Sequence, residues 1–216
     1  KNLEEAKKKI RKITNKNILT IKYDLNNTKD IKKLFDKTEK YYKSDVDILI
    51  NNSGGPPPKE IINLSNKDWE NAYNINLKSS INSSIIAVKK MKKKNWGRII
   101  NLTSTTAKEP AKGMGLSNVS RAALASFGKT LSIEVAKYGI TVNTILTGGV
   151  LTDRLKNLIK IRIKGSKLKL NDEISRISKN IPVGRIAKPE EFIQLILFLA
   201  SENSSYITGS SIAIDG

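Results

Sequence analysis

The stretch Asp47-Ile48-Leu49-Ile50-Asn51-Asn52-Ser53-Gly54 decides the fold prediction for this chain. Its first half is short, apolar and β-branched, which is typical of a buried strand. Its second half consists of small, turn-forming residues, which allow a backbone to approach a bound ligand closely. An ordinary turn after a strand has the same composition, so the stretch alone predicts the strand and leaves the ligand open.

Strand-like and helix-like segments alternate around this stretch. The strand pattern occurs in residues 17–23, 46–50, 98–103, 141–146 and 211–214. Apolar residues at helical spacing occur in residues 3–13, 28–38, 65–94, 117–138 and 189–201. Thr28 is an expected N-cap, and Ser65 with Asp68 is an expected capping box. The alternation predicts a doubly wound parallel sheet in a three-layer α/β/α fold, with ligands bound at the carboxyl ends of the strands.

Residues 151–182 interrupt this alternation, because the segment is longer than a normal connection and rich in Lys and Ile. Such a segment near the carboxyl ends of strands predicts a mobile lid. The remaining sequence contains no internal repeat and no low-complexity linker. A chain of 216 residues is long enough for one core, so we expect a single domain over residues 1–216.

The composition is strongly basic, with 39 Lys and Arg against 20 Asp and Glu and a formal net charge of +19. Such a charge attracts polyanions. The lysines are spread along the chain together with many Asn and Ile residues, as in an AT-rich coding sequence, and no compact aromatic and basic module is visible. Nucleic-acid binding is therefore a minor alternative that rests on charge alone.

The chain contains no cysteine and no histidine. Disulfides, zinc-thiolate sites, histidine metal sites and Ser-His hydrolysis are thereby excluded, and no metal is expected. No apolar run reaches the ~18 residues of a membrane helix, and no signal peptide is visible. We expect a soluble, cytoplasmic protein that does not bind membranes.

Four motifs occur in a characteristic order: Asn51-Asn52-Ser53-Gly54, Asn76 within a helix, the strand 97–103 ending on Ser104, and residues 138–143 followed by 147–152. From about Asn17 to the last residue, the sequence resembles the short-chain dehydrogenase/reductase family. The resemblance implies a Rossmann-like dinucleotide-binding domain that uses NADP or NAD. It also places the family's first strand and Gly-rich pyrophosphate loop before Lys1.

The resemblance implies roles for individual residues. Asn76 and Ser104 match members of the catalytic tetrad, Thr152 matches the threonine that contacts the nicotinamide carboxamide, and Asp24 matches the aspartate near the adenine ring. The implied cofactor-binding residues are Asp24, Asn51, Asn52, Ser53, Gly54, Arg121 and Thr152. The implied catalytic residues are Asn76, Ser104, Ser117 and Arg121.

The sequence departs from the family at its most important motif. The family carries Tyr-x-x-x-Lys thirteen residues after the serine, whereas this chain has Ser117 and Arg121 in those two positions. An aliphatic hydroxyl is a far weaker acid than a phenol, and general acid-base help is worth ~10²–10⁴ in rate. Arg121 preserves the positive charge and can bind ribose hydroxyls, but it does not exchange protons near neutrality.

Three functions remain open at this point. The first is an NAD(P)-dependent oxidoreductase that reduces a carbonyl or oxidises an alcohol and resembles β-ketoacyl-carrier-protein reductases; its substrate is a small molecule, anionic or carried on an acyl carrier. The second is a cofactor-binding sensor or scaffold without chemistry, and the third is a basic RNA-binding protein. The resemblance also implies a homodimer or homotetramer formed through helices at residues 73–88 and 122–135.

Overall fold

The computed structural model describes residues 2–216, and its centre is one parallel sheet. The strands β1 (Ile48–Asn51), β2 (Gly97–Leu102), β3 (Ile140–Thr147) and β4 (Ser211–Ile214) lie side by side in the order β1-β2-β3-β4. Each neighbouring pair is parallel. All carboxyl ends therefore meet at one edge of the sheet, where a ligand site is expected.

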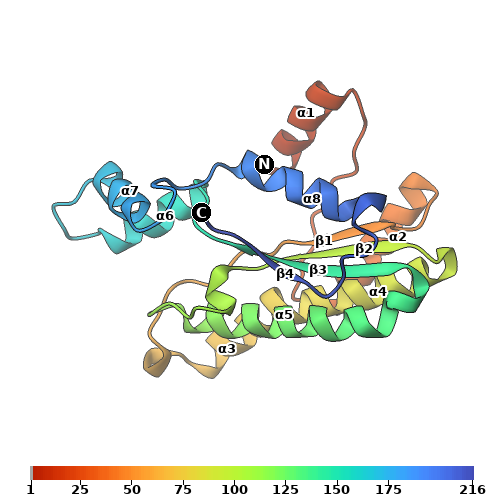
Figure 1. Ribbon diagram of the computed structural model, residues 1–216, viewed down its shortest axis with the longest axis horizontal. Helices are drawn as coiled ribbons and strands as arrows, with labels where there is room; N and C mark the ends of the chain where they lie inside the picture. The colour runs from red at the N-terminus through yellow and green to blue at the C-terminus, as the bar shows by residue number, and fades with distance from the viewer. Residues whose placement is uncertain (1) are drawn as a thin grey trace.

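Helices cover both faces of this sheet (Figure 1). On one face, α2 (Thr28–Tyr42), α4 (Ser79–Lys94) and α5 (Gly115–Val135) bury apolar side chains against Ile99 and Val142. On the other face, α8 (Ile193–Ala200) packs Leu199 against Ile100 and Ile145. Neighbouring residues Ile99 and Ile100 thus serve opposite cores, as the alternation of a strand requires. The predicted three-layer α/β/α arrangement is confirmed.

The predicted strand at residues 17–23 is wrong, because this segment follows α1 (Asn2–Thr14) without entering the sheet. A strand exists only through hydrogen bonds to a neighbouring strand. In the described part of the chain β1 is an edge strand, and its Ile48 and Ile50 are exposed. The free edge of β1 is therefore left unpaired, and residues 17–23 do not form a strand against it.

The long helix predicted for residues 65–94 is interrupted. It begins as α3 (Asn66–Tyr73), passes through a π-helical turn (Asn74–Lys78) and continues as α4. The predicted capping box is present, since Ser65 Oγ accepts from Asp68 N at 3.2 Å and Asp68 Oδ2 accepts from Ser65 N at 2.9 Å. At the start of α2 the cap is Asn27, not Thr28, because the Asn27 side chain accepts from Lys29 N. The π-turn contains Asn76 and turns it inward.

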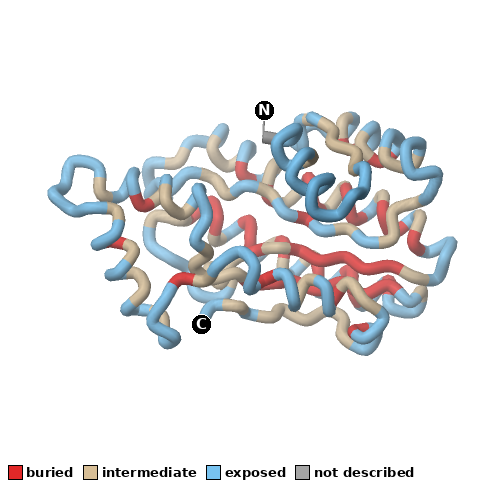
Figure 2. Tube along the Cα trace, turned by 90° about the horizontal axis from the view of Figure 1, so that it is seen from above, coloured by how far each residue is buried: buried red, intermediate tan, exposed pale blue. Residues whose placement is uncertain are grey.

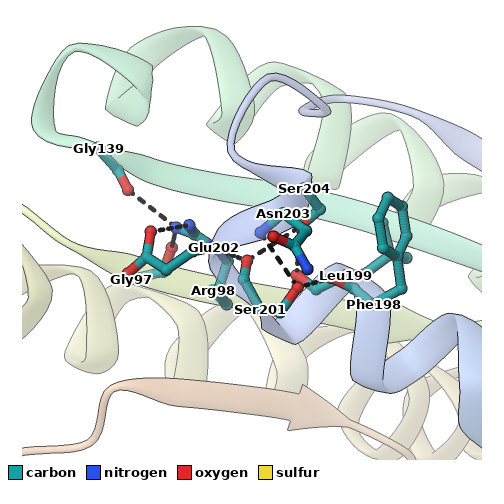
Figure 3. Close-up of polar contacts among 9 residues, drawn as sticks. All are labelled: Gly97, Arg98, Gly139, Phe198, Leu199, Ser201, Glu202, Asn203 and Ser204. Carbon is teal, nitrogen blue, oxygen red and sulfur yellow. Dashed lines mark hydrogen bonds and ion pairs between the residues drawn. The ribbon is translucent and has the colours of Figure 1, made fainter.

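Arg98 connects the segments that meet at the amino-terminal ends of the strands (Figure 3). This side chain is almost fully buried, and it donates to the backbone oxygens of Gly97, Gly139 and Ser201 at 2.9, 3.2 and 3.1 Å. It also lies 3.5 Å from the carboxylate of Glu202. One guanidinium therefore joins β2, the turn before β3 and the end of α8, far from the carboxyl ends of the strands.

Residues 151–182 form two helices beside the sheet, α6 (Asp153–Arg162) and α7 (Leu170–Lys179). Figure 2 shows that buried residues concentrate in the middle of the molecule and are sparse in these helices. Glu173 on α7 is an exception, because it is buried and pairs with Arg176 at 2.7 Å and with Arg162 of α6 at 3.3 Å. This ion-pair cluster ties the two helices to each other.

The chain leads back to the sheet through a 3-10 turn (Pro189–Phe192) and α8, in place of the single helix predicted from residue 189. Within residues 2–216, none of the helices has the length and apolar character needed to cross a membrane.

Candidate active site

A cleft of about 660 Å³ opens at the carboxyl ends of the strands. This volume lies within the ~300–1,000 Å³ range of small-molecule sites. Its walls come from the loop after β1, the end of β2, the start of α5, the loop after β3, α6 and α8. The polar and glycine residues of the lining are Asn52, Ser53, Gly54, Gly55, Thr103, Ser104, Ser117, Arg121, Thr147, Gly148, Gly149, Thr152 and Arg154.

Arg121 is the buried cation of this cleft. It lies on α5 with 8 % of its surface exposed, and it donates to the backbone oxygens of Leu102 and Ser53 at 2.8 and 3.1 Å. The α5 helix therefore fixes the ends of β1 and β2 relative to each other. Burial lowers the pKa of the Arg121 guanidinium, and the charge of Arg154 lowers that pKa further. An arginine still remains protonated near neutrality.

Ser104 and Ser117 both line the cleft. Ser104 follows β2, and its Oγ accepts from Thr106 N at 3.2 Å, which begins a 3-10 turn (Thr105–Ala107). Ser117 lies in the first turn of α5 and is mostly buried. In the described part of the chain, no Tyr, Lys, Asp or Glu lines the cleft, so its ionisable groups are two arginines. The cleft offers hydroxyl hydrogen bonds and positive charge, but no side chain that exchanges protons near neutral pH.

Asn76, one of the four residues predicted to be catalytic, lies behind the cleft wall and does not line it, unlike Ser104, Ser117 and Arg121. Its Nδ2 donates to Ser53 Oγ at 3.1 Å and to the backbone oxygen of Gly54. The π-helical turn supplies this orientation. Asn76 thus supports the loop formed by Asn52, Ser53 and Gly54, all of which line the cleft.

Two predicted cofactor residues lie outside the cleft. Asn51 is buried, and its Nδ2 donates to Asn101 Oδ1 at 2.8 Å and to Ser84 Oγ at 3.1 Å, which ties β1 to β2 and α4. Asp24 is exposed, and its carboxylate accepts from Asn26 N at 2.9 Å in the turn before α2. Both side chains are used in local structure, and neither is brought to the residues around Arg121.

Thr152 lines the cleft and caps α6, because its Oγ1 accepts from Leu155 N at 3.3 Å. Of the basic residues in the predicted lid, Arg154 lines the cleft, whereas Lys156, Lys160 and Arg162 do not. The sequence pattern of residues 151–182 did not single out Arg154 from the other basic residues. Its position two residues after Thr152 was the available signal.

These features define a class: a parallel α/β protein with a cation-bearing ligand cleft at the carboxyl ends of its strands. A family model described as enoyl-(acyl carrier protein) reductase matches residues 1–216. The chain therefore belongs to this family of short-chain dehydrogenases/reductases.

Similar proteins include the 3-oxoacyl-[acyl-carrier-protein] reductase of Buchnera aphidicola subsp. Schizaphis graminum. It is 36% identical over 210 residues, which cover 97% of this chain and 81% of that protein. Among solved structures, YwfH, an NADPH-dependent reductase involved in bacilysin biosynthesis, gives a TM-score of 0.92 at 31% identity, covering 100% of this chain and 83% of that one. L-Sorbose reductase from Gluconobacter frateurii, in complex with NADPH and L-sorbose, gives 0.93 at 26% identity, covering 99% and 81%.

Proposed function

We propose that this protein binds NADPH or NADH in the cleft and reduces a carbonyl compound, or oxidises the corresponding alcohol, at a low rate. The observation that carries the proposal is the meeting of Ser104, Ser117, Arg121 and Thr152 in one cleft. The named activities of the similar proteins support the reaction class, and the two solved structures above support NADPH as the cofactor.

The residues present fit a dinucleotide. A Cβ added at Gly54 would have no neighbouring atom within 4 Å, so the loop after β1 leaves open space beside the cleft. Two guanidinium groups and no carboxylate in the described lining suit a ligand that carries phosphates. Thr152 and Arg121 are the residues we assign to the nicotinamide ribose end. Such a cofactor supplies hydride chemistry when bound.

The chain's own residues then act on the substrate oxygen. We assign to the hydroxyls of Ser104 and Ser117 hydrogen bonds to that oxygen, and to the charge of Arg121 the stabilisation of the negative charge that develops on it. No lining side chain delivers the proton, so we assign this step to water in the open cleft. The missing phenol lowers the rate by the ~10²–10⁴ that a positioned acid contributes.

The second candidate is a cofactor-binding sensor or scaffold without turnover. One observation favours it: the two ionisable groups of the described cleft lining are arginines, which do not exchange protons near neutral pH. In this function the cofactor-binding residues keep their roles: Asn52, Ser53, Gly54, Arg121 and Thr152. Ser104 and Ser117 then only line the cleft and do not act on a substrate.

One experiment separates the two functions. The dissociation constants of NADPH and NADH are measured by nucleotide fluorescence, and turnover is measured with ethyl acetoacetate and with a 3-oxoacyl thioester on an acyl carrier. Binding with slow oxidation of the nucleotide supports the reductase. Binding without any oxidation supports the sensor, and absence of nucleotide binding removes both. Preference for the carrier-bound thioester would identify a 3-oxoacyl-carrier-protein reductase-like activity.

We infer that residues 151–182 act as a lid over this site. Leu155 and Leu158 of α6 line the cleft, so movement of α6 changes access to it. Hydrogen exchange of α6 and α7 with and without NADPH tests the inference. Slower exchange on binding is expected, and equal exchange contradicts a lid.

We infer that two or four copies assemble through the exposed apolar surface of α3, α4 and α5. A groove of about 300 Å³ between α3 and α5 is lined mainly by apolar side chains, among them Trp69, Leu77 and Val119. Tyr73, Val119 and Ile133 are exposed by 49, 54 and 72%. An apolar groove with exposed apolar side chains on the same helices is typical of protein interfaces, and a second copy of the chain is the partner we propose.

A further inference from the structure

The cleft carries two guanidinium groups and no carboxylate. Arg121 and Arg154 both line it, and no Asp or Glu is among its lining residues in the described part of the chain. Like charges in one cleft repel each other, and the charge of Arg154 contributes to the lowered pKa of Arg121. An anion bound beside them relieves this repulsion.

Arg154 keeps most of its hydrogen-bonding capacity free. Among residues 2–216, its guanidinium has one acceptor, the backbone oxygen of Pro56, at 3.1 Å from Nη2. None of the ion pairs within that range involves Arg154. Because a guanidinium has five N–H donors, the remaining donors are available to a ligand.

The contact with Pro56 places this guanidinium at the wall of the cleft. It reaches from the first turn of α6 to the loop after β1, and Gly55 provides the space. A Cβ at Gly55 would lie 2.7 Å from Nη2 of Arg154 and 3.3 Å from its Cζ, so a larger residue would displace the guanidinium. The hydrogen bond to Pro56 therefore positions the guanidinium at the cleft wall, while the residue itself remains exposed.

Arg121 contributes in a different way. Both of its terminal nitrogens already donate to backbone oxygens, and the residue is buried. No carboxylate of the described lining neutralises its charge. Arg121 therefore supplies mainly positive charge from the wall of the cleft, whereas Arg154 supplies free hydrogen-bond donors.

We propose that Arg154 is the anion-recognition residue of this cleft and binds a carboxylate or phosphate group of the ligand. The planar fork of a guanidinium matches both groups in a bidentate geometry. This role rests on the proposed function for the location of the ligand, and it further specifies that the ligand carries a negative charge. Two sources share this chemistry: the acid group of a substrate and a phosphate of the cofactor.

The test compares the wild-type protein with Arg154→Gln, Arg154→Lys and Lys160→Gln. Lys160 is exposed on the same helix and lies outside the cleft, so its variant loses the same charge elsewhere. Calorimetry measures the binding of NADPH, inorganic diphosphate, acetoacetate and ethyl acetoacetate. Diphosphate and the two acetoacetate probes are each titrated into the protein without nucleotide.

Arg154→Gln should lower the affinity for the anionic probe that binds Arg154 roughly ten- to hundredfold, as expected for lost hydrogen bonds between charged groups. Ethyl acetoacetate is uncharged, and its binding should not change. Arg154→Lys should retain part of the affinity, and Lys160→Gln should change it by less than about twofold because the charge lies outside the site. If Arg154→Gln loses affinity for NADPH and diphosphate, Arg154 binds a phosphate of the cofactor. If it loses affinity for acetoacetate, Arg154 binds the acid group of a substrate.

Three results would overturn the inference. The first is unchanged binding of every anion in Arg154→Gln, and the second is a wild-type protein that binds none of them. The third is equal weakening of acetoacetate and its ester, which means that Arg154 only holds the loop at Pro56. A protein that binds diphosphate or acetoacetate through Arg154 but does not bind NADPH sustains this inference and refutes the proposed function.

Discussion

Arg121 donates a hydrogen bond from Nη2 to the backbone oxygen of Ser53 at 3.1 Å, and this contact links α5 to the loop after β1. Nη1 of the same side chain donates to Leu102 at the end of β2, at 2.8 Å. The lysine that the sequence resemblance implies for this position has only one terminal nitrogen. The guanidinium donates through two terminal nitrogens, one to the end of β2 and one to the loop after β1. Arg121 therefore has a structural role besides any contact with a ligand.

Replacing Arg121 by Met should therefore lower the free energy of unfolding by about 2–4 kcal/mol, because two backbone oxygens lose a charged donor. Urea unfolding followed by circular dichroism measures this change. Arg121→Lys, the control, should lose less because it keeps one charged donor. An Arg121→Met variant as stable as the wild type would show that these oxygens find other donors.

Introducing Ser117→Tyr together with Arg121→Lys should raise carbonyl reduction about a hundredfold, because a phenol beside a lysine supplies the missing acid. Initial rates of NADPH oxidation with ethyl acetoacetate measure the effect. Ser117→Tyr alone and Arg121→Lys alone are the controls; the first should give a smaller gain, and the second should give none because it adds no phenol. Fast turnover by the wild type that collapses in the double variant would show a different working mechanism.

Arg98 and Glu202 form an ion pair whose two side chains differ in exposure. This difference allows a test of what stabilises the amino-terminal ends of the strands. The Arg98 side chain is 2% exposed, whereas that of Glu202 is 75% exposed. Arg98→Met should cost about 3–5 kcal/mol of unfolding free energy, because three backbone oxygens lose their donor. Glu202→Gln should cost less than about 1 kcal/mol, as expected for a solvated ion pair. Similar costs in chemical unfolding would contradict this account.

Glu173 should make the stability of the protein sensitive to acid. Hydrogen bonds from Arg176, together with Arg162 and against the effect of burial, lower the pKa of Glu173 from 4.5 to about 2. Because the folded state favours the ionised carboxyl, its contribution is complete above about pH 4.5 and is lost as the pH falls towards 2.

The difference in melting temperature between the wild type and Glu173→Gln isolates this contribution. The wild type should melt higher at pH 6, and the difference should shrink between pH 4.5 and pH 2, the ordinary and lowered pKa values of this carboxyl. Asp68 and Glu191, whose pKa values are also lowered to about 2, are present in both proteins and cancel. A difference that stays constant over this range would show that Glu173 acts through packing alone.

Val119 provides the test of the proposed assembly. It is 54% exposed on α5 and lines the groove beside α3. Val119→Asp should convert the assembly into monomers, because a buried unpaired carboxylate is costly at an interface. Light scattering at micromolar concentration measures the mass, with Val119→Ala as a control that should still assemble. A monomeric wild type would refute the assembly.

Local patterns in the sequence determined most of the secondary structure. Strands β1 to β4, the cap at Ser65 and the helix α5 depend on apolar periodicity and on residues a few positions apart, so they were predictable. The motif order also brought Ser104, Ser117 and Arg121 into one expected site, because the carboxyl ends of parallel strands share one edge.

Tertiary structure decided the rest, because it depends on contacts between distant residues. Residues 17–23 have a strand pattern, but a strand also needs a paired neighbour, and this segment does not pair with the free edge of the described sheet. Asn51 was predicted to bind the cofactor and Asn76 to be catalytic, yet packing turns both towards protein partners. Arg154 joins the cleft through a contact with Pro56, 98 residues earlier in the chain. Local sequence rules cannot reach that far, because such a contact forms only when the sheet brings its strand ends together.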